Sequence, residues 1–216
     1  MATIAVIDYG SSNLRSVVKA IETVAGTRAR VDVTDDAGRI RAADRVVFPG
    51  QGAIGNCVSE LHGHRLVEVI SECASVKPFL GICLGLQSLM QTSDEDGGTP
   101  CLGLYAGGVR RFPTQPPAAA DGTPQKVPHM GWNEVHWTRP HPLTAGIADR
   151  SRFYFVHSYY VVPDDPALTL GETAYIETFT AALADGYVFA TQFHPEKSAT
   201  AGLTLLRNFV SWDGGT

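Results

Sequence analysis

The chain has 216 residues, of which 44% are hydrophobic and 18% charged, and its formal net charge is −5 at pH 7. This composition is that of a globular protein with a substantial core, and it excludes an intrinsically disordered chain. The mild excess of acid, without a basic stripe that carries aromatic residues, argues against nucleic acid as the main partner.

Targeting and redox features are those of a cytoplasmic protein. The N-terminal sequence MATIAVIDYG has neither the basic region nor the long apolar region of a signal peptide. No apolar run approaches the ~18 residues that a membrane span requires. The four cysteines, Cys57, Cys73, Cys83 and Cys101, form no C-x-x-C pair, which favours reduced thiols. We therefore expect a cytoplasmic location and no membrane partner.

The first half of the chain alternates between predicted strands and helices. Strands are expected over residues 3–7, 29–33 and 45–48, and helices over residues 14–24, 35–43 and 56–74. Ser12 or Asn13 is expected to cap the first helix, and Gly26 to end it, while the last helix is interrupted near Gly63. The alternation implies right-handed crossovers and a doubly wound, mostly parallel sheet flanked by helices.

A loop with three glycines, PGQGAIG at residues 49–55, follows the third strand. Ligands of open α/β sheets bind at the carboxyl ends of the strands. One interpretation is a backbone segment whose N–H groups face a developing negative charge, and the alternative is a permissive connecting loop. Parallel-sheet geometry can place the N–H of Gln51 beside the N–H of Leu84.

The sequence KPFLGICLGLQSLMQ at residues 77–91 predicts a buried strand that passes into a helix at Cys83 and continues to Met90. Gly81 and Gly85 flank the cysteine, as in a Cys version of the G-x-S-x-G nucleophile elbow. The helix dipole favours a thiolate there, and the N–H of the next residue points toward an oxyanion formed in front of the sulfur. From this stretch alone, a buried structural cysteine stays an alternative.

The segment after the elbow is polar over residues 92–99, which predicts the end of the helix. A strand is expected over residues 101–112, with a turn at Gly107-Gly108. Residues 114–125, TQPPAAADGTPQ, are rich in Pro, Ala and Gly and predict a flexible loop.

From residue 127 the pattern changes to short β runs, with Asp185-Gly186 placed as a hairpin turn. Residues 199–212 are amphipathic and predict a helix that packs back on the sheet. The C-terminal half is therefore expected to be β-rich.

The sequence TQFHPEKS near the C-terminus supplies a base and its partner. Because residues i and i+2 of an extended segment share a face, Glu196 can orient the imidazole of His194, and Pro195 stiffens the link. Together with Cys83 these residues predict a Cys-His-Glu triad. His157 is a rival base, but it has no carboxylate at i+2, and its aromatic neighbours favour a structural role or a wall of the substrate site.

With these stretches placed, the chain resembles the triad-type (class I) glutamine amidotransferases over essentially its full length. The resemblance rests on PGQG at 49–52, GICLGLQ at 81–87 and FHPEKS at 193–198. It implies a single domain over residues 1–216 with the α/β fold of that family. The site residues expected are the triad Cys83, His194 and Glu196, the oxyanion-hole residues Gly50, Gln51, Gly52 and Leu84, and the glutamine contact Gln87.

Two further stretches, VPHMGWNEV at 127–135 and FYFVHSYYV at 153–161, are similar to a narrower group of the family, which supplies ammonia for histidine biosynthesis. This implies hydrolysis of glutamine to glutamate and ammonia, and a heterodimer with a (β/α)8-barrel cyclase subunit. That cyclase makes imidazole glycerol phosphate and aminoimidazole carboxamide ribotide. The resemblance places partner contacts at Met130 and Trp132, and the ammonia exit near Tyr154 and Lys197.

No metal or organic cofactor is expected, because a thiol, an imidazole and backbone amides supply every step. Two alternatives stay open. The first is a triad-type glutaminase subunit with a different acceptor enzyme, against which the sequence PHMGWN argues. The second is a catalytically idle interaction subunit or a stand-alone cysteine hydrolase, and the intact triad argues against the idle subunit.

Overall fold

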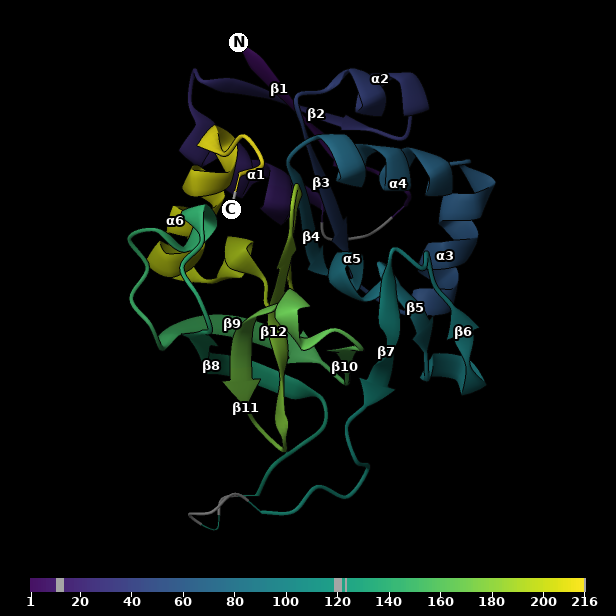
Figure 1. Ribbon diagram of the computed structural model, residues 1–216, viewed down its shortest axis with the longest axis vertical. Coiled ribbons are helices and arrows are strands. Elements are labelled where there is room, and N and C mark those ends of the chain that lie inside the picture. The colour runs from purple at the N-terminus through teal and green to yellow at the C-terminus, as the bar shows by residue number, and fades with distance from the viewer. Residues whose placement is uncertain (11–13, 119–121, 123, 216) are drawn as a thin grey trace.

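The computed structural model describes residues 1–10, 14–118, 122 and 124–215 (Figure 1). The strands in chain order are β1 (Ala2–Ile7), β2 (Ala29–Thr34), β3 (Arg45–Gly50), β4 (Phe79–Cys83), β5 (Met90–Ser93), β6 (Thr99–Pro100), β7 (Tyr105–Arg111), β8 (His129–Trp137), β9 (Ser151–His157), β10 (Tyr159–Pro163), β11 (Thr169–Ala174), β12 (Thr178–Asp185) and β13 (Val188–Thr191). The α-helices are α1 (Leu14–Ala25), α2 (Ala37–Ala42), α3 (Ile54–Gly63), α4 (Val67–Val76), α5 (Leu84–Gln87) and α6 (Ala199–Ser211). The short 3₁₀ helices within the described residues are η1 (Glu95–Gly97), η2 (Pro142–Thr144), η3 (Pro166–Leu168) and η4 (Pro195–Lys197).

A single sheet runs through the described residues in the order β2-β1-β3-β4-β13-β12-β10-β7-β5-β6. The first five of these strands are parallel, and β12 is the first antiparallel neighbour. β11 pairs with β12 and β8, and β8 pairs with β9, so the second half of the chain adds an antiparallel layer. The predicted α/β fold with a mostly parallel centre and a β-rich C-terminal half is confirmed.

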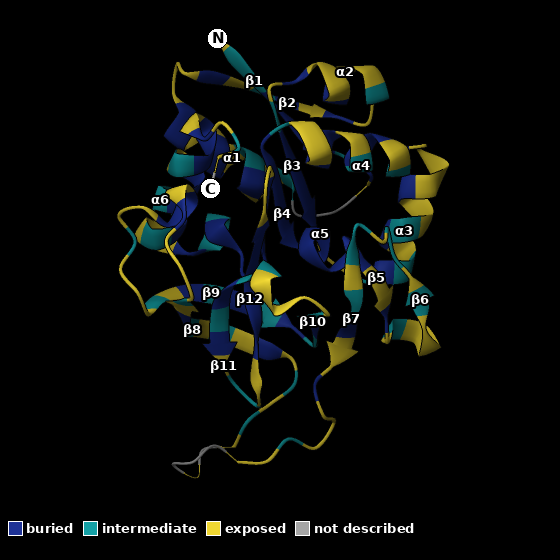
Figure 2. Ribbon diagram, viewed as in Figure 1, coloured by how far each residue is buried: buried dark blue, intermediate teal, exposed yellow. Residues whose placement is uncertain are grey.

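Helices cover both faces of the parallel strands (Figure 1). Along β1, Ile4 and Val6 pack in one core with α1 and α6, whereas Ala5 and Ile7 pack in a second core with α2, α3 and α4. This alternation explains why the strand is apolar throughout: each face is covered. The central strands are accordingly buried along most of their length (Figure 2).

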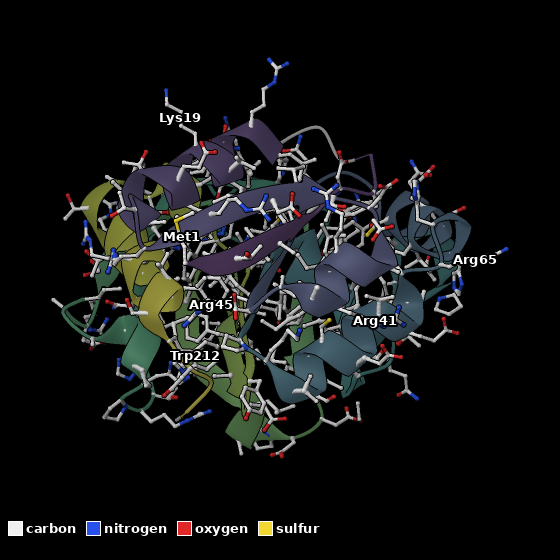
Figure 3. The ribbon with its side chains drawn as sticks, turned by 90° about the horizontal axis from the view of Figure 1, so that it is seen from above. Met1, Lys19, Arg41, Arg45, Arg65 and Trp212 are labelled. Atoms are coloured by element: carbon white, nitrogen blue, oxygen red, sulfur yellow. The ribbon has the colours of Figure 1, made fainter. Side chains whose placement is uncertain are left out.

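The amino end of β3 is tied to the C-terminal helix. Arg45 Nε donates to the carbonyl oxygen of Phe209 at 3.1 Å, and the backbone N–H of Trp212 donates to the same oxygen at 3.2 Å. Figure 3 shows Arg45 and Trp212 together at this end of the molecule. The carboxyl ends of β3 and β4, where the predicted chemistry lies, are therefore at the opposite edge.

The elbow helix is shorter than predicted. α5 ends at Gln87, and Met90 begins β5, which pairs with β7 opposite Tyr105. Every residue from Phe79 to Met90 is buried, so the apolar spacing carries no information about which face meets the core. Pairing with the sheet therefore decided the conformation, and the extension of the helix to Met90 was wrong.

The turn predicted at Gly107-Gly108 was also wrong, because β7 continues through both residues and pairs them with Pro163 and Val162. A Cβ on Gly107 would lie 2.9 Å from the Cα of Pro163. Glycine at 107 therefore permits close contact between β7 and β10 instead of a turn.

The loop predicted over residues 49–55 is shorter in the structure, because Pro49 and Gly50 end β3 and Gly55 lies in α3. The expected caps Ser12 and Asn13 lie outside the described residues. So does part of the expected loop 114–125, whose described residues belong to no helix or strand. The turn at Asp185-Gly186 is confirmed between β12 and β13.

Among the described residues, no helix has the length and apolar character needed to cross a membrane. The same part of the chain holds no group of three or more His, Cys, Asp or Glu side chains arranged to bind a metal ion.

Candidate active site

Cys83 lies at the corner between β4 and α5 in a strained conformation, with φ 54° and ψ −106°. A non-glycine residue at positive φ costs about 1–3 kcal/mol and persists only when its surroundings enforce it. A Cβ on Gly85 would collide with the carbonyl oxygen of Phe48, and a Cβ on Gly81 would lie 2.9 Å from the Cβ of Ala190. The two glycines thus let β3 and β13 close around the corner that holds the thiol.

His194 and Glu196 form a buried pair beside this corner. Nδ1 of His194 lies 2.8 Å from Oε1 of Glu196, and their side chains are 2% and 0% exposed. Because a carboxylate only accepts hydrogen bonds, Nδ1 is the donor and the lone pair of the neutral ring sits on Nε2. Nε2 is buried, and Cys83 is a second side chain that interacts with the ring.

The charge state of His194 is set by opposing effects. Burial disfavours the imidazolium, but the negative charges of Cys83 and Glu196 outweigh it and raise the pKa of His194 from 6.5 to about 10. The imidazole is therefore protonated at neutral pH when the thiol is ionised. A thiolate and an imidazolium side by side are the arrangement of an activated cysteine nucleophile.

Backbone hydrogen bonds hold the imidazole in place. The N–H of His194 donates to the carbonyl oxygen of Tyr154 on β9 at 2.9 Å, and the Tyr154 N–H donates to Ser198 Oγ at 3.0 Å. Ser198 Oγ in turn donates to the carbonyl oxygen of His194 at 2.6 Å. The segment that carries His194 is thus bonded directly to β9.

The residues expected to form the oxyanion hole lie next to Cys83. In the parallel register of β3 and β4, Gly50 stands opposite Cys83, and the residues that follow them, Gln51 and Leu84, both line one cavity. Gly52 adopts φ +101°, a conformation open to glycine and strained for other residues. The sequence order therefore brings the backbone of 50–52 to the thiol.

A cavity of about 420 Å³ opens at this point, within the 300–1,000 Å³ typical of small-molecule sites. Its lining residues are Gln51, Gly52, Cys83, Leu84, Gln87, Glu95, Pro128, Val156, His157, Ser158, Tyr159 and His194. Two of the three triad residues and three of the four expected oxyanion-hole residues line it.

Gln87, expected to contact glutamine, lines the cavity but is only 5% exposed. Its Nε2 donates to the carbonyl oxygen of Tyr159 at 2.9 Å and to Gln192 Oε1 at 3.0 Å. Gln192 Nε2 lies 3.7 Å from Cys83 Sγ. The sequence analysis missed Gln192, although the i, i+2 argument that paired His194 with Glu196 places Gln192 on the same face.

The four residues expected at the partner surface and the ammonia exit lie on neighbouring segments. Met130 and Trp132 are 63% and 44% exposed on β8, whereas Tyr154 and Lys197 are half-buried. Trp132 stands opposite Tyr154 in the β8–β9 register, with their rings 6.1 Å apart in an edge-to-face arrangement. The exposed Trp132 is thus paired with the residue whose carbonyl oxygen accepts a hydrogen bond from the His194 N–H.

His157 also lines the cavity, but its ring bonds inward. Nδ1 lies 2.8 Å from the carbonyl oxygen of Tyr159, and Nε2 lies 2.9 Å from Nδ1 of His129. Both nitrogens are engaged away from the thiol, as expected for a wall of the site.

The chain belongs to the glutamine amidotransferase class-I family, whose family model matches residues 5–212. Several of its curated relatives share the name "Imidazole glycerol phosphate synthase subunit HisH". The protein of Nitrosococcus oceani is 56% identical and covers 99% of both chains, and that of Aromatoleum aromaticum is 56% identical over 98% of this chain and 99% of its own. The protein of Pseudomonas putida is 52% identical over 99% of both chains.

Solved structures share the fold at lower identity. The structure of PurLQS from Thermotoga maritima has a TM-score of 0.73 at 17% identity, and the match covers 97% of this chain and 98% of that one. The structure of a glutamine amidotransferase from the same organism has a TM-score of 0.62 at 17% identity, and the match covers 93% of this chain and 78% of that one. At these identities the likeness concerns the fold.

Proposed function

We propose that the chain is the glutaminase subunit of imidazole glycerol phosphate synthase. It hydrolyses glutamine to glutamate and ammonia, which a cyclase subunit uses in histidine biosynthesis. The observation that carries the proposal is the strained Cys83, which lines one cavity together with His194 of the buried His194–Glu196 pair. Relatives that are 51–56% identical over nearly the whole chain and bear the synthase name support it.

The first half of the reaction forms a thioester. The Cys83 thiolate attacks the side-chain amide carbon of glutamine, and the C=O electron pair moves to oxygen. The imidazolium of His194 then gives its proton to the departing nitrogen, so that ammonia leaves as the C–N bond breaks. Glu196 holds the ring through Nδ1 and stabilises its charge.

The second half returns the enzyme to its starting state. Neutral His194 takes a proton from water, which attacks the thioester carbon and forms a second tetrahedral intermediate. When this intermediate collapses, the C–S bond breaks and the Cys83 thiolate is restored beside an imidazolium. The new carboxyl group loses its proton to solvent, and the product leaves as glutamate.

Both tetrahedral intermediates carry a negatively charged oxygen, which hydrogen-bond donors must stabilise. The N–H groups of Gln51 and Leu84 supply them, and the position of both residues in the cavity lining supports this assignment. Loss of one such donor costs about 2.7–4 kcal/mol of transition-state stabilisation. Gly50 and Gly52 flank Gln51 and allow its peptide to rotate, so the donor can be supplied or withdrawn.

The partner is a (β/α)8-barrel cyclase that docks on the face of β8 to form a heterodimer with lyase activity. Met130 and Trp132 supply exposed apolar contact area there. Tyr154 and Lys197 border the path by which ammonia passes to the cyclase. Residues 1–216 act as one domain, which the single sheet of the described residues supports, and the complex works in the cytoplasm.

The test is co-purification with the cyclase followed by an assay of glutamine-dependent cyclisation. The proposal predicts a stable complex that forms imidazole glycerol phosphate from glutamine and the acceptor nucleotide. A complex that cyclises only with added ammonia would contradict the glutaminase assignment. A chain that hydrolyses glutamine but binds another acceptor enzyme would contradict the partner.

A further inference from the structure

Gln192 contacts Cys83 from outside the cavity lining. Its Nε2 lies 3.7 Å from Cys83 Sγ, and the residue is fully buried. It is absent from the cavity lining, where Cys83 and Gln87 are both found. Gln192 therefore reaches the sulfur without reaching the substrate.

The orientation of this amide is fixed by a backbone carbonyl. The carbonyl oxygen of Tyr159 only accepts, so the atom of Gln87 that lies 2.9 Å from it must be the NH₂ group. The same NH₂ group lies 3.0 Å from Gln192, which must therefore present its oxygen to Gln87. The NH₂ group of Gln192 is left facing the sulfur.

Two buried histidines, His129 and His157, are joined in series by hydrogen bonds to the carbonyl oxygen of Tyr159. Because Tyr159 O accepts from Nδ1–H of His157, Nε2 of that ring accepts from Nδ1–H of His129 at 2.9 Å. Nε2 of His129 then accepts from the side-chain amide of Asn133 at 3.3 Å. Each donor in this series meets an acceptor, so the tautomers of both rings are determined.

Both rings stay neutral, as this series requires. Burial lowers the pKa of His129 to about 4, and burial together with His129 lowers that of His157 to about 3. The series ends at Asn133 on β8, next to the exposed Trp132. It accounts for two residues of the PHMGWN sequence that the proposed reaction does not use.

We propose that Gln192 is a positioning residue, which donates a hydrogen bond to the Cys83 thiolate and stabilises it in the attacking position. Gln87 and the carbonyl of Tyr159 hold its amide in the required orientation. A hydrogen bond to the charged form of a group favours that form. The effect on turnover rests on the proposed glutaminase function, whereas the effect on the thiol does not.

The first experiment measures thiolate formation in the full-length chain. Cys83 alkylation by iodoacetamide is followed across pH by mass spectrometry of the Cys83 peptide. Gln192→Glu keeps an oxygen for Gln87 and replaces the NH₂ group that faces the sulfur. The matched control is Gln91→Glu, the same change at an exposed position of β5.

Wild type and the control are expected to share one alkylation midpoint, and Gln192→Glu to raise it by at least about 1 pH unit, the worth of one charge-assisted hydrogen bond. The other ionisable groups facing the cavity or the imidazole, His194, Glu196, His157 and Glu95, are the same in all variants. Gln192→Met, which adds no charge, is expected to raise the midpoint by about 1 pH unit, and it replaces Gln192→Glu if that variant does not fold.

The second experiment separates kcat from KM in the complex with the cyclase. Because Gln192 lies outside the cavity lining, kcat should fall about tenfold for Gln192→Met while KM is unchanged. An unchanged alkylation midpoint in a folded Gln192→Met variant overturns the proposal, as does a raised KM with normal kcat. If the wild-type complex hydrolysed no glutamine, the proposed function would fail, and the alkylation midpoints would still decide the role of Gln192.

Discussion

The imidazole of His194 donates a hydrogen bond of 2.8 Å to Glu196, and neither side chain has more than 2% of its surface exposed. Such a pair is shielded from solvent, so its carboxylate acts on the ring at close range and in a medium of low polarity. It orients the ring and stabilises the imidazolium. These two effects can be separated by mutation.

Glu196→Gln is expected to keep the fold and to lower glutamine turnover by about two to four orders of magnitude, the contribution of one general acid–base group. The amide can still accept from Nδ1 but provides no negative charge. Turnover is measured in the complex, and thermal melting checks the fold. Glutamine turnover equal to wild type would remove Glu196 from the mechanism.

Trp132→Ala is expected to weaken cyclase binding by about 2 kcal/mol, because large aromatic residues at interface centres act as hot spots. The matched control is Tyr187→Ala, which removes another exposed aromatic residue between β12 and β13. The carbonyl oxygen of Tyr187 accepts a hydrogen bond from the N–H of Phe79 at the amino end of β4, so this control position lies away from Cys83. Isothermal titration of the two chains gives the affinities, and unchanged binding by the Trp132 variant would refute the interface.

The free energy of unfolding is expected to fall as the pH is lowered, and His141 contributes to this fall. Burial, with a smaller effect of Arg139, lowers the pKa of His141 to about 4. The unfolded chain binds this proton more tightly, so the stabilising effect is complete above pH 6.5 and is lost as pH falls toward 4. For one histidine the loss is at most roughly 3 kcal/mol.

The substitution His141→Asn tests the contribution of His141 to the pH dependence of stability. The His141 side chain accepts from the N–H of Leu143 at the start of η2, a role that Asn also performs. Urea unfolding as a function of pH should therefore give a shallower acid dependence for His141→Asn than for wild type. His62→Asn at an exposed position is the control, and equal slopes for all three proteins would contradict the assignment.

The isolated chain is expected to hydrolyse glutamine slowly, and the complex with acceptor nucleotide rapidly. The peptide of Gln51 can rotate between Gly50 and Gly52, so its N–H can point toward or away from the oxyanion. Gly52→Ala disfavours the observed φ of +101° and should change the ratio of the two rates. Rates are measured for the chain, the complex and the complex with nucleotide, and three equal wild-type rates would exclude such a switch.

The residues proposed for the chemistry could be predicted from the sequence because their motifs are local. Cys83 stands between two glycines, and His194 and Glu196 are two residues apart, so each motif can be recognised within a short stretch of sequence. The approach of His194 to Cys83 depends on the pairing of β13 with β4. The strands and helices of the first half were also predictable from apolar spacing, because each βα unit has its own amphipathic helix.

Features that depend on contacts distant in sequence were missed. Leu89 and Met90 match helical spacing, but every residue from Phe79 to Met90 is buried, and the pairing of Met90 with Tyr105 of β7 decides the conformation there. Gly107 has the sequence signature of a turn, yet it serves the close packing of β10. Gln192 acquires its contact with Cys83 only through the pairing of β13 with β4.

The most direct test of the proposed function compares two nitrogen sources in the complex of the cyclase with Cys83→Ala. The account predicts that glutamine-dependent cyclisation is abolished while ammonia-dependent cyclisation stays close to wild type, because ammonia production and ammonia use reside in different subunits. Glutamine hydrolysis that persists in the Cys83→Ala complex would contradict the assignment of Cys83 as the nucleophile.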